Sequence, residues 1–112
     1  MNWKMLTTDR ELDDLIAASA EKPQVIFKHS TRCSISAVVK TRLERDFFPD
    51  TVDFHYLDLI RYRALSNRVA EDFHVEHESP QVLVIRNGQC VYDESHSSIR
   101  MDDVLEQTTA AG

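Results

Sequence analysis

The chain has 112 residues, a hydrophobic share of 42% and a net charge of −6, which predict a single domain over residues 1–112 with one hydrophobic core. No run of lysine and arginine forms a basic arm, and no apolar stretch approaches the roughly 20 residues that span a bilayer. Neither nucleic acid nor a membrane is therefore expected as a partner. The N-terminal segment lacks the apolar centre of a signal peptide, so we expect a cytoplasmic protein.

The first half of the chain alternates between expected strands and helices. A short strand is predicted at residues 2–6, and a capping box at residues 8–11 then begins a helix that ends before Pro23. The apolar run within residues 24–29 predicts a buried strand. A second helix follows and stops before Pro49. Its expected buried stripe recurs every four residues, at Ile35, Val39, Leu43 and Phe47.

The second half begins with an expected strand at residues 52–58, rich in β-branched and aromatic residues, and a helix at 60–73. The continuous apolar run at 82–85 is typical of a strand that is buried on both faces. Asn87-Gly88 is a strong hairpin signal, which makes residues 89–93 the returning strand.

The chain is expected to close with one more helix. Ser97 and Ser98 offer a cap for it, and its apolar face holds Met101, Val104, Leu105 and Thr108. The predicted order is therefore β-α-β-α-β-α-β-β-α. This order indicates an α/β fold in which a central mixed β-sheet is flanked by helices on both faces.

Cys33 stands at the junction between the strand at 24–29 and the helix that follows it. The N-terminus of a helix favours a negative charge, such as a thiolate. Lys28, Arg32 and Lys40 are near in sequence and can add positive charge. The motif is C-x-x-S, with Ser36 where a redox dithiol carries its second cysteine. No pair of ligands has the short spacing of a metal site, so no metal is expected.

The order of elements, with a cysteine at the tip of the second strand, resembles the thioredoxin-like fold. Ser79-Pro80, directly before the buried strand at 82–85, strengthens the resemblance. Thioredoxin-like proteins hold a cis-proline at this point, opposite the active cysteine. Thioredoxins also carry a buried acid six residues before that cysteine, whereas this chain has Phe27 there. This difference favours a glutaredoxin-like exchange with a small thiol.

The segment at residues 28–36 reads K-H-S-T-R-C-S-I-S. It resembles the motif K-H-S-T-x-C-P-I-S of the monothiol bacilliredoxins, which belong to the bacillithiol system. The one departure is Ser34, where the family often has a proline that would rigidify the first helical turn. Serine leaves this turn looser and adds a hydroxyl near the sulfur.

The resemblance implies a monothiol thiol–disulfide oxidoreductase that binds no cofactor and uses bacillithiol, a low-molecular-weight thiol with an anionic malate group, as co-substrate. Its partners would be S-bacillithiolated proteins. Cys33 would be the nucleophile, and Ser36 a catalytic hydroxyl that can hydrogen-bond the thiolate. Substrate binding would involve Arg32, as the candidate for the malate carboxylates, together with Thr31, Ser34, Ser79 and Pro80.

Several alternatives stay open at the level of sequence. The domain could be a non-catalytic peptide-binding module or redox adaptor that uses the groove at Pro80, or a dithiol enzyme in which Cys90 resolves the mixed disulfide. Arg32 could equally be a charged side chain in a loop that is solvated and binds no carboxylate. For His29, at the end of a strand, a packing role is favoured over proton transfer.

Overall fold

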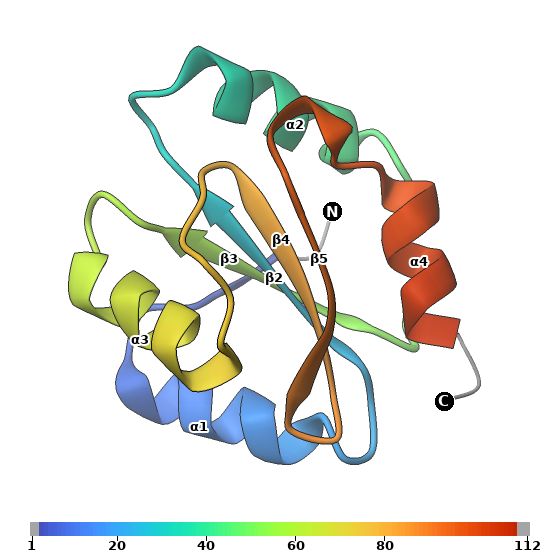
Figure 1. Cartoon of the computed structure of the whole chain (residues 1–112). Coiled ribbons are helices and arrows are strands. Elements are labelled where there is room, and N and C mark those ends of the chain that lie inside the picture. The colour runs from blue at the N-terminus through green and yellow to red at the C-terminus, as the bar shows by residue number, and fades with distance from the viewer. Residues whose placement is uncertain (1–2, 110–112) are drawn as a thin grey trace.

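The computed structural model describes residues 3–109 (Figure 1). The elements, in chain order, are β1 (Trp3–Met5), α1 (Asp9–Ala18), β2 (Gln24–His29), α2 (Ser34–Glu44), β3 (Asp53–Asp58), α3 (Arg63–Phe73), β4 (Gln81–Arg86), β5 (Gln89–Ser95), the 3-10 turn η1 (His96–Ser98) and α4 (Met101–Thr109). The predicted order is confirmed, with η1 as an addition. Residue 2 of the first expected strand lies outside the described residues.

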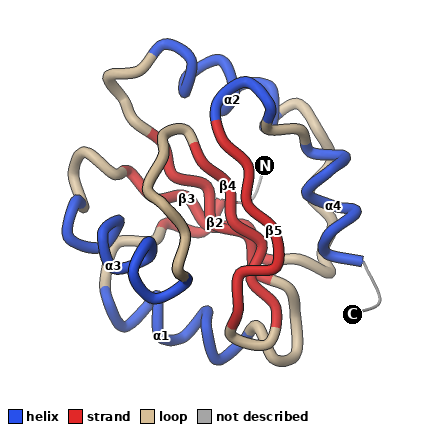
Figure 2. Tube along the Cα trace, in the orientation of Figure 1, coloured by secondary structure: helices blue, strands red, loops and turns tan. Residues whose placement is uncertain are grey.

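The five strands form one mixed sheet in the order β1-β3-β2-β4-β5. β2 is its middle strand and pairs parallel with β3 and antiparallel with β4. Figure 2 shows the sheet as a central layer, with α1 and α3 on one side and α2 and α4 on the other. Between Trp3 and Thr109, no helix combines the length and the apolar character that crossing a bilayer requires.

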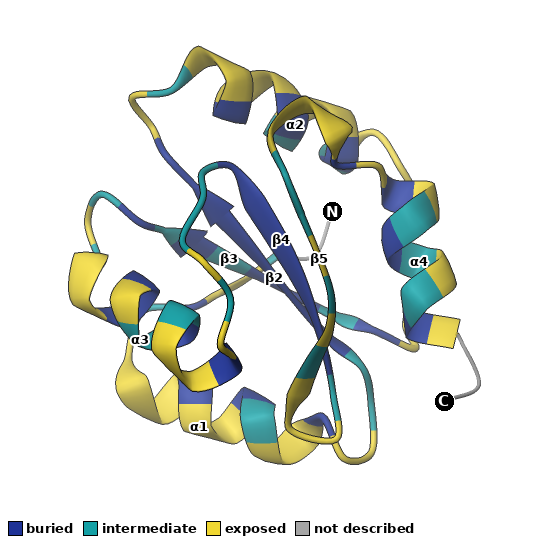
Figure 3. Ribbon diagram, viewed as in Figure 1, coloured by how far each residue is buried: buried dark blue, intermediate teal, exposed yellow. Residues whose placement is uncertain are grey.

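β2 is buried along its whole length because both of its faces carry helices (Figure 3). Val25 and Phe27 belong to the core cluster that includes residues of α2 and α4. Ile26, pointing the other way, belongs to the cluster that includes residues of α1 and α3. This two-sided packing makes β2 a rigid base for the loop that follows it.

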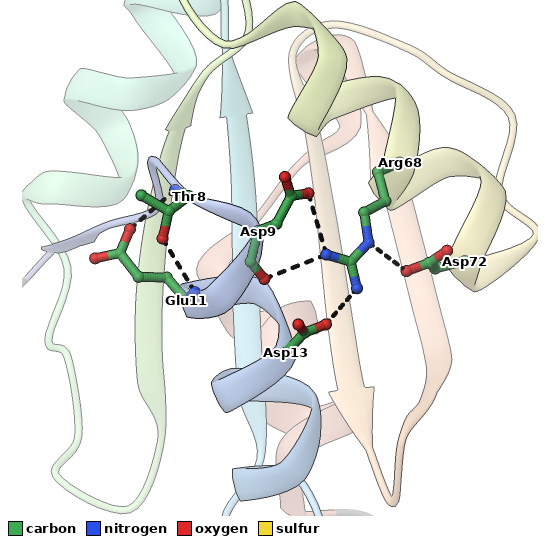
Figure 4. A network of polar contacts seen from close by, with 6 residues as sticks. All are labelled: Thr8, Asp9, Glu11, Asp13, Arg68 and Asp72. Atoms are coloured by element: carbon green, nitrogen blue, oxygen red, sulfur yellow. Dashed lines mark hydrogen bonds and ion pairs between the residues drawn. The ribbon is translucent and has the colours of Figure 1, made fainter.

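Side chains at the start of α1 cap this helix and join it to α3 (Figure 4). Thr8 and Glu11 form the predicted capping box, with the Glu11 N–H donating to Thr8 Oγ1 at 3.1 Å. Arg68 of α3 pairs with Asp9, Asp13 and Asp72. Asp9 and Asp13 are exposed, so each of their ion pairs contributes at most about 1 kcal/mol.

The predicted stripe of α2 is only half right. Val39 and Leu43 are buried, but Ile35 is 50% exposed and Phe47, beyond the end of the helix, is 76% exposed. A four-residue period drifts by about 40° per step around a helix of 3.6 residues per turn, so such a stripe cannot stay on one face. The buried face instead begins with Ser36, three residues before Val39.

The predicted cap of the last helix is also wrong. Ser97 and Ser98 lie in η1, and α4 begins only at Met101. A hydroxyl caps the turn that directly follows it, and here Ile99 and Arg100 separate the serines from the helix. The apolar face of α4 is otherwise as expected, since Met101, Val104 and Thr108 are buried.

Candidate active site

Cys33 is the N-cap residue of α2, four residues after the end of β2. Its backbone N–H donates to the Ser30 carbonyl at 3.2 Å, and its own carbonyl accepts from the Ala37 N–H at 3.1 Å. The thiol is free and half-buried. The predicted position at a strand-to-helix junction is confirmed. Unpaired N–H groups of the first helical turn favour a negative charge at this place.

Ser36 is fully buried beneath the cysteine loop. Its hydroxyl oxygen accepts a hydrogen bond from the Ser30 N–H at 3.1 Å and lies 2.7 Å from Nδ1 of His29. The structure therefore directs this hydroxyl to β2 and the loop, and not to the Cys33 sulfur as predicted. A serine on the buried face of α2 reaches the end of the strand below it, which the C-x-x-S spacing alone does not reveal.

His29 forms the other half of this buried pair. Burial lowers the pKa of His29, and the nearby Lys40 lowers it further, so the imidazole is neutral at pH 7 and can share a hydrogen bond with Ser36. Its ring packs against Tyr56, with centroids 5.5 Å apart. The expected structural role of His29 agrees with these contacts, but its pairing with Ser36 was not predicted.

Replacing Ser36 by alanine is expected to reduce the free energy of unfolding by about 1 to 3 kcal/mol, because the buried Ser30 N–H loses its acceptor and His29 its partner. Ser34→Ala is the matched control: Ser34 is an exposed serine of the same helix, and its loss should stay within about 0.5 kcal/mol. Urea denaturation measures both. Equal midpoints for the two variants would show that the Ser36 contacts do not hold the loop.

Ser79 and Pro80 lie at the same edge of the sheet as Cys33. Their peptide bond is cis, and β4 begins at the next residue. Lys28 pairs with Gln81 in the antiparallel β2–β4 ladder, so the loop after β2 and the loop before β4 leave the sheet together (Figure 1). The carbonyl of Pro80 accepts from the His96 N–H at 2.9 Å, while Ser79 makes no backbone hydrogen bond within residues 3–109.

The other predicted site residues divide into two groups. Thr31 and Arg32 are exposed on the loop before Cys33, and Ser34 is exposed at the first position of α2. The Arg32 side chain forms no ion pair with the described part of the chain. Lys40 is engaged elsewhere, because its ammonium lies 2.7 Å from the Glu44 carboxylate. The Lys28 side chain is buried between β2 and α3, so it adds no surface charge beside the Cys33 sulfur.

Cys90 is at the opposite edge of the sheet. It pairs with Ile85, four residues along β4 from Gln81, which is about 13 Å of strand. Disulfide formation needs Cα atoms within about 7 Å, so Cys33 and Cys90 cannot bridge in this fold. Burial also raises the pKa of the Cys90 thiol to about 11. The dithiol alternative is therefore excluded for this conformation.

Within residues 3–109, no cluster of three or more His, Cys, Asp or Glu side chains is suited to a metal ion.

A free cysteine at a helix N-terminus, at the same sheet edge as a cis-proline, defines the class of thioredoxin-fold thiol oxidoreductases. Solved structures agree with this class. The chain is similar to a protein described as a candidate oxidoreductase with a thioredoxin fold (28% identity, TM-score 0.79, covering 95% of this chain and 92% of that one). It shares the fold of the Malassezia sympodialis thioredoxin (16% identity, TM-score 0.79, covering 97% and 92%) and the Fasciola hepatica thioredoxin (17%, TM-score 0.72, covering 97% of each chain).

The family follows from a match along most of the chain. Residues 4–104 match the model of the monothiol bacilliredoxin BrxC family, and the chain belongs to this family. Together with the oxidoreductase among its structural relatives, this membership supports a thiol oxidoreductase-like role.

Proposed function

We propose that the protein removes bacillithiol from S-bacillithiolated proteins through a mixed disulfide at Cys33. The observation that carries the proposal is the state of this cysteine: a free thiol at the N-terminus of α2, with a hydroxyl at position 36 and the other cysteine at the far edge of the sheet. A thiol in this setting can attack a disulfide, but neither position 36 nor Cys90 can resolve the product.

The reaction then has two exchange steps. The Cys33 thiolate attacks the bacillithiol sulfur of the substrate disulfide, a new S–S bond forms, and the substrate cysteine leaves as a thiolate that takes a proton. A second low-molecular-weight thiol, as its thiolate, attacks the bacillithiol sulfur on Cys33. This step releases the Cys33 thiolate and a small-molecule disulfide. Each step breaks one S–S bond and forms another, so overall the entering thiol is oxidised into a disulfide as the substrate cysteine is reduced to a thiol, and no bound cofactor takes part.

The groups around Cys33 are assigned to binding. Ser79, with its unpaired backbone N–H and carbonyl next to cis-Pro80, would pair with an extended segment of the substrate protein. Arg32 would bind the malate carboxylates, for which a guanidinium is well shaped. Thr31 and Ser34, on either side of the Arg32–Cys33 pair, would supply hydroxyl hydrogen bonds to the small thiol.

The choice of small thiol is tested with one carrier protein prepared as two mixed disulfides, one with bacillithiol and one with glutathione. We expect release from the bacillithiol form to be faster by about tenfold or more, because glutathione lacks the malate group and a charge-assisted hydrogen bond contributes about 1.5 kcal/mol or more. Intact mass measured over time follows both reactions. Equal rates would overturn the assignment to bacillithiol, and no release from either would favour a binding module.

Replacing Arg32 by glutamine is expected to raise KM for the bacillithiolated substrate by about tenfold at unchanged kcat, because the group lost binds and does not react. Arg45→Gln is the matched control, since Arg45 is also an exposed arginine but lies at the other end of α2. Steady-state kinetics of both variants give the answer. A KM in Arg32→Gln that equals that of Arg45→Gln would mean that Arg32 is only a solvated charge.

A further inference from the structure

Lys28 is a lysine with no accessible surface, in the middle strand of the sheet. It is two residues after Ile26, so its side chain points to the face covered by α1 and α3. Buried lysines are rare and are usually paired with a carboxylate. Within the described residues, Lys28 has no such partner. Its Nζ donates to the Ser66 carbonyl of α3 at 3.1 Å and lies 3.3 Å from Nδ1 of His77.

Gln81, the cross-strand neighbour of Lys28, is the second buried polar group under the same loop. Its side-chain amide donates to the Glu76 carbonyl at 2.9 Å. One cross-strand pair therefore contacts two successive residues of the segment 74–80, Glu76 through its backbone and His77 through its ring. Pro80 follows only three residues after His77. The two buried side chains thus support from below the segment that ends in the Ser79–Pro80 bond.

Holding a cation in this place opposes folding, since burial penalises the ammonium and an apolar side chain of similar volume would be tolerated there. The contacts of Lys28 run in two directions from the buried strand β2. They join the active-site strand to α3 and to the segment that presents Ser79. A group that is costly to bury, and whose bonds lead to a site, indicates a role in that site.

We propose that Lys28 is a positioning residue for the exchange reaction: through His77 it sets the segment 74–80, so that the backbone of Ser79 is ready to pair with the substrate protein next to Cys33. The inference rests on the proposed function of Cys33. It concerns only the binding of an extended protein segment. The reactivity of Cys33 toward a small reagent should not depend on it.

The test uses Lys28→Met, His77→Gln and the double variant. For a bacillithiolated protein substrate we expect KM to rise by about tenfold or more in each single variant, the effect of one lost hydrogen bond to a charged group, with kcat unchanged. The double variant should be no worse than either single one, because both break the same link. Alkylation of Cys33 by iodoacetamide should keep the wild-type rate. His74→Asn is the matched control, an exposed histidine of the same segment whose left-handed backbone asparagine tolerates.

Hydrogen exchange provides a readout that needs no reaction. Amides of residues 74–80 should exchange faster in Lys28→Met and His77→Gln than in the wild type and in His74→Asn. Wild-type KM in both single variants, or effects that multiply in the double variant, would overturn the inference while leaving the proposed function intact. If the wild-type protein transferred no bacillithiol, the proposed function would fail, and unchanged exchange in the variants would still refute the positioning role by itself.

Discussion

Replacing Cys33 by serine is expected to abolish the transfer of bacillithiol, with the rate falling to the uncatalysed background. The exchange needs a thiolate, and a serine hydroxyl is neither ionised at neutral pH nor able to form the mixed disulfide. The fold should survive, because Cys33 is half-buried and its thiol caps no backbone group of α2. Loss of bacillithiol from a carrier protein, followed by intact mass, measures the effect, and circular dichroism checks the fold.

The matched control is Cys90→Ser, which removes the other thiol of the chain. It should keep the wild-type rate, because Cys90 is half-buried at the far edge of the sheet and its thiol pKa is raised. Transfer that persists in Cys33→Ser would contradict the assignment of the nucleophile. Binding of a substrate peptide that persists in that variant, together with no transfer in the wild type, would identify the domain as a non-catalytic module.

Replacing Lys28 by methionine is expected to change the pH dependence of stability more than any other single change at the site. Burial lowers the pKa of Lys28 to about 8 from an ordinary value of 10.5. Between these values the unfolded chain binds more protons than the folded one, so this residue makes stability rise with pH across that window. Below about pH 8 both states are protonated, and the full penalty, roughly 3 kcal/mol at 1.4 kcal/mol per pKa unit, remains.

The variant removes this penalty but also removes the contacts with the Ser66 carbonyl and with His77, which together offset about 2 kcal/mol. We therefore expect Lys28→Met to be more stable than the wild type by about 1 kcal/mol at pH 7, and the difference to vanish and reverse by about pH 10.5. Urea denaturation of both proteins from pH 6 to pH 10.5 gives the difference, in which the other titrating groups cancel. A difference that stays constant with pH would mean that the ammonium of Lys28 is not penalised by burial.

At position 28, the residue expected to give the higher free energy of unfolding differs from the residue expected to give the lower KM. Methionine would give a more stable domain, and lysine would give a better positioned segment 74–80. Proteins commonly hold such destabilising groups at their working sites. The expected pair of results, a gain in stability together with a higher KM, distinguishes this position from an ordinary core residue, where both properties would worsen.

Much of the fold could be predicted because its signals are local. The bounds of β2, the capping box of α1 and the Asn87-Gly88 hairpin each depend on a few neighbouring residues, and each was found as expected. The stripe of α2 was misplaced because a four-residue repeat was read as one face. Which helical residues are buried depends on the orientation in which the helix packs on the sheet, and the sequence of the helix alone does not determine this orientation.

The candidate site was predictable only in its outline. The place of Cys33 follows from a strand-to-helix junction, and that of Ser79-Pro80 from the start of a strand. The partners of Ser36 and Lys28 depend on which face of an element each side chain occupies. For Lys28, the one signal in the sequence is its position in an apolar strand, two residues after Ile26. Alternation along the strand puts its side chain on the same covered face as that of Ile26, whereas a charged side chain is usually found at the surface.

Locating the mixed-disulfide intermediate tests the role of Cys33 directly. The reduced protein is mixed with a bacillithiolated carrier protein, free thiols are blocked with an alkylating reagent after short times, and digested peptides are identified by mass. We predict one bacillithiol on the peptide with Cys33, rising and then falling as a second thiol is added, and none on the peptide with Cys90. A carrier that loses its bacillithiol while Cys33 is found only in alkylated form, or bacillithiol found on Cys90, would contradict it.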